Sequence, residues 1–320
     1  MDTRYAYITG RVRALEARLL DKLKMERMIA ATSAKASLSE LEETDYGPYV
    51  SQLKDVNNFE GLLYDELKRL YSFIDKGSLD KELTDLFRIR YDFHNLKVFL
   101  KNEFKEKPLP LEELPFIDLG TIEPLKIGEA KKFLQIQKET TRAFEENKNP
   151  QDIDIILDKE YYRLCVEKAE ESENEFVINL FQKEIDLVNI KTFFRCQTLK
   201  RNKNFFLKIF IGKGILTKAL FLEFYEKEEN AFLRKLSFTP YAKAIMGYEK
   251  KGLKGLELSC DNFFLECLKK TKLITAGLEV LIAYLIAKEN EIKLLRSVLI
   301  GKINEIPAQM IRERMRETFI

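Results

Sequence analysis

The sequence has few residues that break helices and almost none that could serve imidazole chemistry. Its 320 residues include only 13 glycines and 8 prolines, roughly half the usual frequency of each. Turns are therefore sparse and elements long, which argues against a sandwich or barrel of many short strands. The sequence has no tryptophan and a single histidine, His94. Any mechanism that needs two imidazoles is thereby excluded.

Cysteine is also scarce, and no two cysteines form a C-x-x-C pair. The four residues are Cys165, Cys196, Cys260 and Cys267. A zinc site needs several clustered ligands, which one histidine and scattered thiols do not supply. We therefore expect no metal site and no cofactor, and we interpret the cysteines as buried free thiols in a reducing cytosol.

Long hydrophobic runs are missing as well. The most apolar stretch, Leu273–Ala287, contains Glu279 and falls short of the roughly 20 residues that a membrane-spanning helix needs. The first residues include Asp2 and lack an apolar core, which is unlike a signal peptide. Any contact with a membrane is expected to come through a partner.

Neither sign of charge is in excess over the whole chain. Lys and Arg together number 54 against 52 for Asp and Glu, which gives a net charge of +2. A protein that binds nucleic acid over a large surface is normally far more basic. Apolar residues make up 45% and charged residues 33%, as in folded, soluble proteins. We therefore expect no nucleic-acid partner.

Hydrophobic residues recur with a period of about 3.6 throughout the chain, which is typical of amphipathic helices. In Ala6–Leu20, for example, apolar residues face one side and arginines fill the other. Similar stripes predict helices over Leu62–Ile74, Leu79–Phe104, Ala130–Phe144, Ile153–Lys168, Glu175–Leu199, Leu216–Leu236, Leu256–Leu268, Thr275–Ile300 and Pro307–Phe319. No alternating strand pattern appears, so the predicted fold class is all-α.

An internal repeat is the most informative feature of the sequence. Residues 94 positions apart match without gaps: the series Asp92, Asn95, Lys97, Phe99 and Gly120 corresponds to Asp186, Asn189, Lys191, Phe193 and Gly214. A weaker third copy lies 102 positions further on, where Cys165 corresponds to Cys267 and Lys191 to Lys293. We therefore predict three similar helical units, over residues 1–110, 111–205 and 206–320.

Catalytic motifs are not evident among these residues. Gly212-Lys213-Gly214 lacks the spacing, the preceding strand and the following Ser or Thr of a phosphate-binding Walker loop, so we interpret its glycines as a helix boundary. His94 has Asp92 and Asn95 nearby but no recognisable nucleophile, and we interpret it as structural. The carboxylates alternate with Lys and Arg along helix faces. No catalytic residue is predicted.

One charged segment departs from the balanced pattern. From Leu187 to Leu222 the sequence has no Asp or Glu but many basic residues. One interpretation is a surface that meets an acidic partner or anionic lipid head groups. The other is a local excess that acidic helices such as Glu167–Glu175 compensate in space. On the first interpretation, the candidate partner-binding residues are Lys200, Arg201, Lys203, Lys208 and Lys213.

Several segments, taken together and in order, resemble the family of C subunits of archaeal and bacterial V/A-type ATPases, the counterpart of the eukaryotic vacuolar d subunit. The segments are Tyr5–Arg18, Asp92–Lys97, Glu184–Lys191, Ala287–Lys293, Arg296, Gly301-Lys302 and Ile311–Met315. The third copy departs from the other two because it has Glu291 in place of Asn95 and Asn189. It also lacks the downstream glycine loop at the same spacing.

The resemblance implies a funnel-like socket built from three helical units around a pseudo-threefold axis. It also implies a non-catalytic rotor component on the cytoplasmic face of the membrane, between the D and F proteins of the central shaft and the proteolipid ring. Such a component would couple ATP turnover to proton or sodium transport. Two alternatives stay open: an unrelated helical-repeat scaffold that binds soluble acidic partners, and a cysteine- or histidine-dependent cytosolic enzyme.

Overall fold

The computed structural model describes residues 2–320, apart from the side chain of residue 229. The chain forms helices joined by turns, and no strand occurs among these residues. The predicted all-α class is confirmed. The chain divides into two compact units: unit 1 combines the residues up to Asp80 with Pro240–Ile320, and unit 2 is Lys81–Thr239. The division into three units at residues 110 and 205 stays a prediction.

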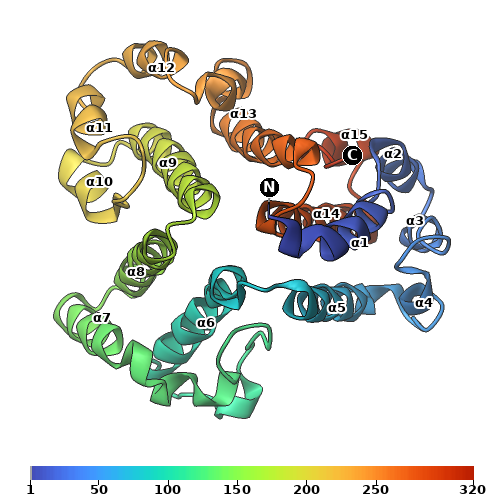
Figure 1. Ribbon diagram of the computed structural model, residues 1–320. Helices are drawn as coiled ribbons and strands as arrows, with labels where there is room; N and C mark the ends of the chain where they lie inside the picture. Colours follow the sequence, from blue (N-terminus) through green and yellow to red (C-terminus); the bar gives the residue numbers. More distant parts are fainter. Residues whose placement is uncertain (1) are drawn as a thin grey trace. The chain divides into compact units, whose positions relative to one another are not determined.

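Unit 1 is built from the two ends of the chain (Figure 1). Its helices are α1 (Ala6–Glu16), α2 (Lys22–Ala30), α3 (Ala34–Ser39), α4 (Gly47–Val50), α5 (Phe59–Gly77), α13 (Ala242–Lys269), α14 (Leu278–Ile303) and α15 (Ala308–Arg312). Short 3₁₀ turns lie at Thr3–Tyr5, Val56–Asn58 and Lys270–Leu273. Unit 1 therefore needs both ends of the chain to complete its core.

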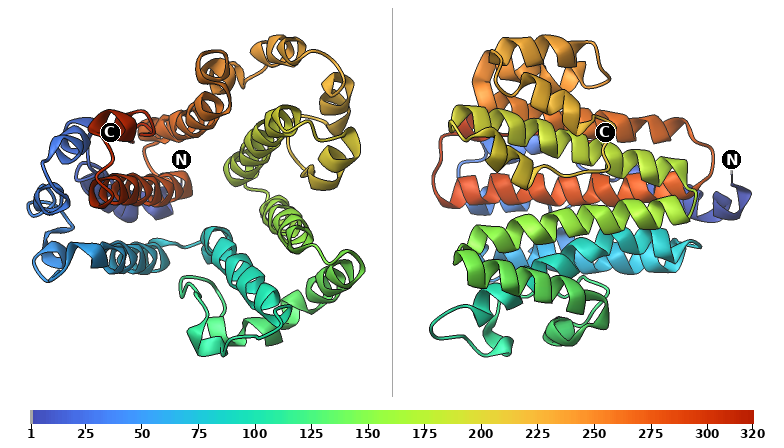
Figure 2. Two further views of the ribbon diagram at one scale, coloured as in Figure 1. Left: turned by 180° about the vertical axis from the view of Figure 1, so that it is seen from behind. Right: turned by 90° about the vertical axis from the view of Figure 1, so that its left-hand side faces the viewer.

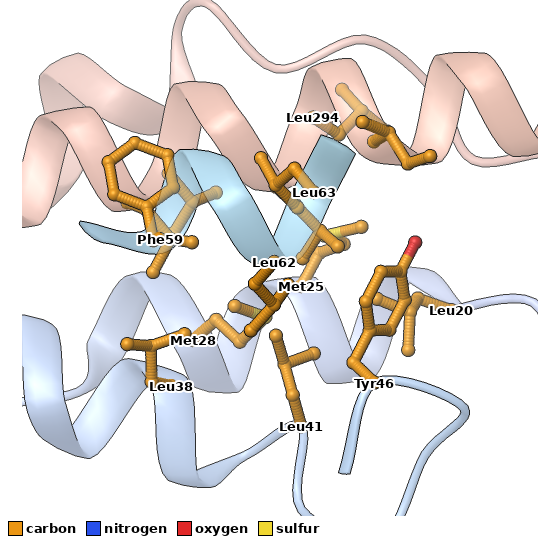
Figure 3. Close-up of a cluster of buried hydrophobic side chains, with 14 of the residues drawn as sticks. Leu20, Met25, Met28, Leu38, Leu41, Tyr46, Phe59, Leu62, Leu63 and Leu294 are labelled. Atoms are coloured by element: carbon orange, nitrogen blue, oxygen red, sulfur yellow. The ribbon is translucent and has the colours of Figure 1, made fainter. Parts of the chain in front are cut away.

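The core of unit 1 surrounds α14, a long unbroken helix (Figure 2). Helices α1, α2, α3, α5, α13 and α15 all pack against it, and α14 is buried on nearly every side. Figure 3 shows Met25 and Met28 of α2, Leu62 and Leu63 of α5 and Leu294 of α14 in one apolar cluster. Burial of a side chain of this kind stabilises the folded state by about 1.5–3 kcal/mol.

Unit 2 is a continuous segment. Its helices are α6 (Lys81–Glu103), α7 (Leu134–Asn147), α8 (Pro150–Glu171), α9 (Glu175–Thr198), α10 (Lys203–Ile209), α11 (Lys218–Phe224) and α12 (Glu229–Ser237). Short 3₁₀ turns lie at Leu111–Glu113, Pro124–Glu129 and Lys131–Phe133. Helix α8 packs against α6, α7 and α9 (Figure 1), and α8 and α9 form a helical hairpin.

Aromatic rings fill the space between α9 and the short helices α10, α11 and α12. The ring of Phe193 on α9 lies 5.7 Å from Phe206 of α10, 6.0 Å from Phe221 of α11 and 4.4 Å from Phe232 of α12. All four side chains are buried. Aromatic pairs at these separations add about 0.5–1.5 kcal/mol each beyond their buried area, so this cluster fixes α10 and the following loop on α9.

Side-chain caps begin most of the helices that position the basic segment. Asn174 accepts a hydrogen bond from the Val177 N–H at the start of α9, and Asn202 accepts one from the Phe205 N–H at the start of α10. Thr217 begins α11 in the same way. Each cap satisfies an N–H group that would otherwise lack a partner, which is worth about 1 kcal/mol.

Two predicted helices are divided or cut short in the structure, and others differ by a few residues at their ends. Leu216–Leu236 is two helices, α11 and α12, because Tyr225 ends the first: its carbonyl accepts from Gln197 Nε2 at 2.5 Å and its hydroxyl donates to the Arg201 carbonyl at 2.9 Å. The predicted closing helix Pro307–Phe319 ends at Arg312. Tertiary contacts outweigh the local helical pattern in both places.

The tail beyond Arg312 bonds to α13. The Glu317 N–H donates to Asn262 Oδ1 at 2.9 Å, and Phe319 is buried. Helices α2, α3, α4 and α10 were not among the predicted stripes, because each is too short to show the period. Helix α13 has a kink at Gly252, where φ is 57°.

Candidate partner-binding site

The repeated Asp and Asn residues hold loops to the long helices of unit 2. In the first copy, the Asn95 amide donates to the Ile117 carbonyl and accepts from the Ile117 N–H, both at 2.8 Å. Asp92 accepts from the N–H groups of Thr121 at 2.9 Å and Ile122 at 3.0 Å. Asp92 and Asn95 are fully buried. We call this arrangement of one Asp, one Asn and the loop backbone a clasp.

The second copy forms the same clasp 94 residues later. Asn189 donates to the Ile211 carbonyl at 2.8 Å and accepts from the Ile211 N–H at 3.0 Å. Asp186 accepts from the N–H groups of Ile215 and Leu216 at 3.1 Å. Both copies therefore bind backbone at equal separations along the chain, 22 residues for Asn and 29 and 30 for Asp.

The remote glycine of each copy is required by the close approach of the Asp carboxylate. A Cβ atom on Gly120 would lie 2.2 Å from Asp92 Oδ1, and one on Gly214 would lie 2.1 Å from Asp186 Oδ1. No side chain other than hydrogen fits at either position. The sequence match of Asp, Asn and Gly thus has one physical cause, the attachment of a loop to a helix.

In unit 1, the third copy of the repeat has a cluster of charged side chains at the position where the other two copies have a clasp. Glu291 on α14 accepts from the backbone N–H of Leu20 and, at 2.7 Å, from the Tyr46 hydroxyl. Lys288, which corresponds to Asp186 in sequence, bonds Glu291 at 2.6 Å and lies 3.2 Å from Glu66. The side chains of Lys288 and Glu66 are at most 1% exposed. A buried ion cluster here replaces the amide and carboxylate of the clasps.

The predicted partner-binding residues lie along one part of unit 2, and the second clasp positions the last of them. Lys200 and Arg201 occupy the connection between α9 and α10, and Lys203 and Lys208 belong to α10. Lys213 lies in the loop that Asp186 and Asn189 hold. We call Lys200, Arg201, Lys203, Lys208 and Lys213 the basic set.

Two members of the basic set have acidic partners in the chain. Lys208 Nζ lies 2.5 Å from Asp152 Oδ1, whose side chain is only 2% exposed. Lys213 Nζ lies 3.1 Å from Glu170 Oε2, and both side chains are about half exposed. Glu170 belongs to the acidic segment that the compensation hypothesis named. That hypothesis therefore holds for part of the set.

The remaining three members face solvent without an ion pair within residues 2–320. Lys200 and Arg201 are exposed, and Lys203 is partly exposed. The Arg201 guanidinium stacks over the Phe205 ring at 5.1 Å from its centroid, which limits its motion while leaving its charge uncompensated. These three residues are the ones available for an acidic partner.

His94 lies on the exposed side of α6, away from the groups that flank it in sequence. Asp92 and Asn95 are buried in the first clasp, so neither can orient the imidazole as a base. Partial desolvation lowers the pKa of His94, and the positive charges of Lys97 and Lys101 act in the same direction. Of the cysteines, Cys165, Cys196 and Cys260 are buried and Cys267 is partly so.

Comparison with known proteins identifies the family. Residues 8–314 match the family described as ATP synthase (C/AC39) subunit. The C subunit of the V-type sodium ATPase of Enterococcus hirae is 27% identical, over 98% of this chain and 99% of that protein. The C subunit of the A-type ATP synthase of Methanocaldococcus jannaschii is also 27% identical, over 96% and 85% respectively. The chain belongs to the ATP synthase (C/AC39) subunit family, and the resemblance is confirmed.

Membership in this family makes the chain a component of a V/A-type ATP synthase complex, and ion transport fits that complex. No described helix combines the length and apolar character needed to cross a bilayer. The clasp residues were recognised from the sequence only as part of a repeat. Their role in attaching loops to helices was not predicted.

Proposed function

We propose that this chain is a non-catalytic rotor component that connects the D and F proteins of the central shaft to the membrane proteolipid ring. The match to the C/AC39 family over residues 8–314 carries the proposal. The three-unit, funnel-like socket and the place on the cytoplasmic face of the membrane belong to the same proposal. In this role the chain transmits torque between ATP turnover and the transport of protons or sodium ions.

The packing within each unit suits a part that must resist twist. Closely packed interiors have low compressibility and transmit strain, and α14 is surrounded by helices on nearly every side. In unit 2, both clasps tie loops to long helices through buried hydrogen bonds. Because these loops are fixed, they add little flexibility to the long helices that would transmit the torque.

We further propose that the basic set docks on an acidic surface of the shaft or of the ring. Lys200, Arg201 and Lys203 provide most of this contact, because Lys208 and Lys213 are already paired. Exposed ion pairs contribute only about 0.2–1 kcal/mol each. Their greater effect is on association rate, since complementary charge steers the encounter.

A charge-reversal variant tests the docking surface. Lys200→Glu, Arg201→Glu and Lys203→Glu are combined, and binding to the purified D–F shaft and to the detergent-solubilised ring is titrated at low and high salt. The matched control combines Lys105→Glu, Lys107→Glu and Lys131→Glu, three exposed lysines with the same charge change. We expect slower association for the basic-set variant only, with a defect that shrinks at high salt as screening increases.

If both variants bind both partners like the native chain at low salt, the basic set is not a docking surface. If the native chain itself binds neither the shaft nor the ring, the rotor proposal is wrong. Folding of both variants is checked by circular dichroism, and surface substitutions of this kind usually change stability by about 0.5 kcal/mol or less.

A further inference from the structure

A pocket in unit 2 lies where α8, α10 and the loop of the second clasp meet. Its volume is about 380 Å³. The residues that matter for its chemistry are Lys159, Leu207, Phe210, Lys213, Leu216 and Lys218. Three lysines thus come from three separate elements: α8, the loop and the start of α11. Its apolar lining comes from α10 and from the loop.

Positive charge in the pocket is not balanced by its lining, which includes no carboxylate among the described residues. Lys213 reaches outside the pocket to Glu170. Lys159 and Lys218 form no ion pair within the described part of the chain. Burial, together with the nearby positive charges of Lys218 and Lys208, lowers the pKa of Lys159. A bound anion would relieve the repulsion among these amino groups.

The loop of the second clasp contributes hydrogen-bond donors to the pocket as well as positive charge. Asp186 accepts hydrogen bonds from the N–H groups of Ile215 and Leu216, which fixes the loop on α9. Among the described residues, no backbone carbonyl accepts a hydrogen bond from the N–H groups of Gly212, Lys213 and Gly214. Lys213 adopts a left-handed φ of 72°. Successive N–H groups beside a left-handed residue form the kind of concave backbone that binds anions.

We propose that this pocket binds a phosphate group, held by the amino groups of Lys159, Lys213 and Lys218 and by the loop N–H donors. A phosphate has more oxygen acceptors and more negative charge than a carboxylate, and so uses three cations better. Leu207 and Phe210 would contact the organic part of a phosphomonoester. The loop is no Walker loop, and no phosphoryl transfer is implied.

The same phosphate chemistry occurs in soluble phosphates and in the head group of phosphatidic acid, so the experiment has two arms. In the first, inorganic phosphate and pyrophosphate are titrated into the full chain by calorimetry at physiological salt. In the second, the chain is sedimented with phosphatidylcholine vesicles that contain or lack phosphatidic acid. Saturable binding in either arm supports the pocket and tells which source of phosphate it accepts.

Paired variants link the binding to the pocket. Lys159→Gln with Lys218→Gln should weaken binding by about tenfold or more, since the double variant removes two charged hydrogen-bond donors from the pocket. The control, Lys105→Gln with Lys107→Gln, removes the same charge from exposed sites outside the pocket and should bind like the native chain. Binding should also raise the pKa of Lys159, followed by NMR of the labelled lysine.

The proposal is wrong if neither arm shows binding, or if both double variants lose affinity equally. It does not depend on the rotor function, because the two lysines changed in the test, Lys159 and Lys218, lie outside the basic set, and Lys213, which belongs to both sites, is left unchanged. Binding of the Lys159→Gln, Lys218→Gln variant to the shaft and the ring should therefore be unchanged, which separates a failure here from a failure of the proposed function.

Discussion

In unit 2 a neutral amide and a carboxylate hold each loop, whereas in unit 1 the corresponding position of α14 is an acid within a buried ion cluster. Asn95 and Asn189 each bond both the N–H and the carbonyl of one loop residue, because an amide donates and accepts. Glu291 only accepts, and takes the Leu20 N–H. An unpaired carboxylate is costly to bury, so Glu291 is found with Lys288.

The difference shows that one helical position can hold a neighbouring segment with different chemistry. In the clasps the bound backbone lies 22 residues further along the chain, whereas Glu291 binds a residue 271 positions earlier. The third copy lacks the downstream glycine loop because the segment held at Glu291 comes from the N-terminal part of the chain. Substitutions at three places in the chain would test this comparison.

The largest effect is expected at the ion cluster. Lys288→Met should lower the free energy of unfolding of unit 1 by about 3–5 kcal/mol, because it leaves the buried carboxylate of Glu291 without its cation and leaves Glu66 paired with Arg69 alone. Lys293→Met, an exposed lysine on the same helix, is the control. Urea unfolding of both variants measures the difference. Equal stability of the two would mean that the cluster does not hold α14 in place.

An intermediate effect is expected at the clasp glycines. Gly120→Ala and Gly214→Ala should each cost about 1–3 kcal/mol, because the new Cβ would overlap an Asp carboxylate. Gly212→Ala is the matched control two residues away, since no atom lies within 4 Å of its Cβ position. Thermal unfolding of the three variants compares them. A loss at only one of the two clasp glycines would contradict the equivalence of the copies.

The smallest effect is expected where the two clasps differ. Thr121 Oγ1 donates to Asp92 Oδ2 at 2.5 Å and accepts from Lys132 at 2.8 Å, while the second copy has Ile215 at this position. Thr121→Ile should cost about 0.5–1.5 kcal/mol, the worth of a typical hydrogen bond. Chemical denaturation measures it against the native chain. A much larger loss would show that the first clasp depends on its hydroxyl.

The sequence predicted the long helices because their apolar periods extend over several turns, as in α5, α6, α8, α9 and α14. It could not predict where α11 ends, since Tyr225 is held by Gln197 and Arg201, which are distant in sequence. The repeat was evident from Asp, Asn and Gly. Its cause was not, because nothing in a linear pattern indicates that Gly120 lies against Asp92.

For the candidate site, the acid-free stretch indicated a group of basic residues but not how far their charges are balanced. Lys208 and Lys213 meet acids on α8, and such pairings depend on how helices pack. Lys159 was overlooked for the same reason: it joins the pocket only because α8 lies beside α10. Family resemblance supplied the functional class, which the residues alone left open among several alternatives.

The composition of unit 1 from two distant segments has a consequence for synthesis on the ribosome. Unit 2 is contiguous and is complete before α14 is translated, whereas α1 to α5 must wait for that helix. Until then Met25, Met28 and Leu62 lack the part of their core that α14 supplies, and exposed apolar surface of this kind favours aggregation. Nascent unit 2 should therefore fold first, while the N-terminal helices keep apolar surface exposed until α14 emerges.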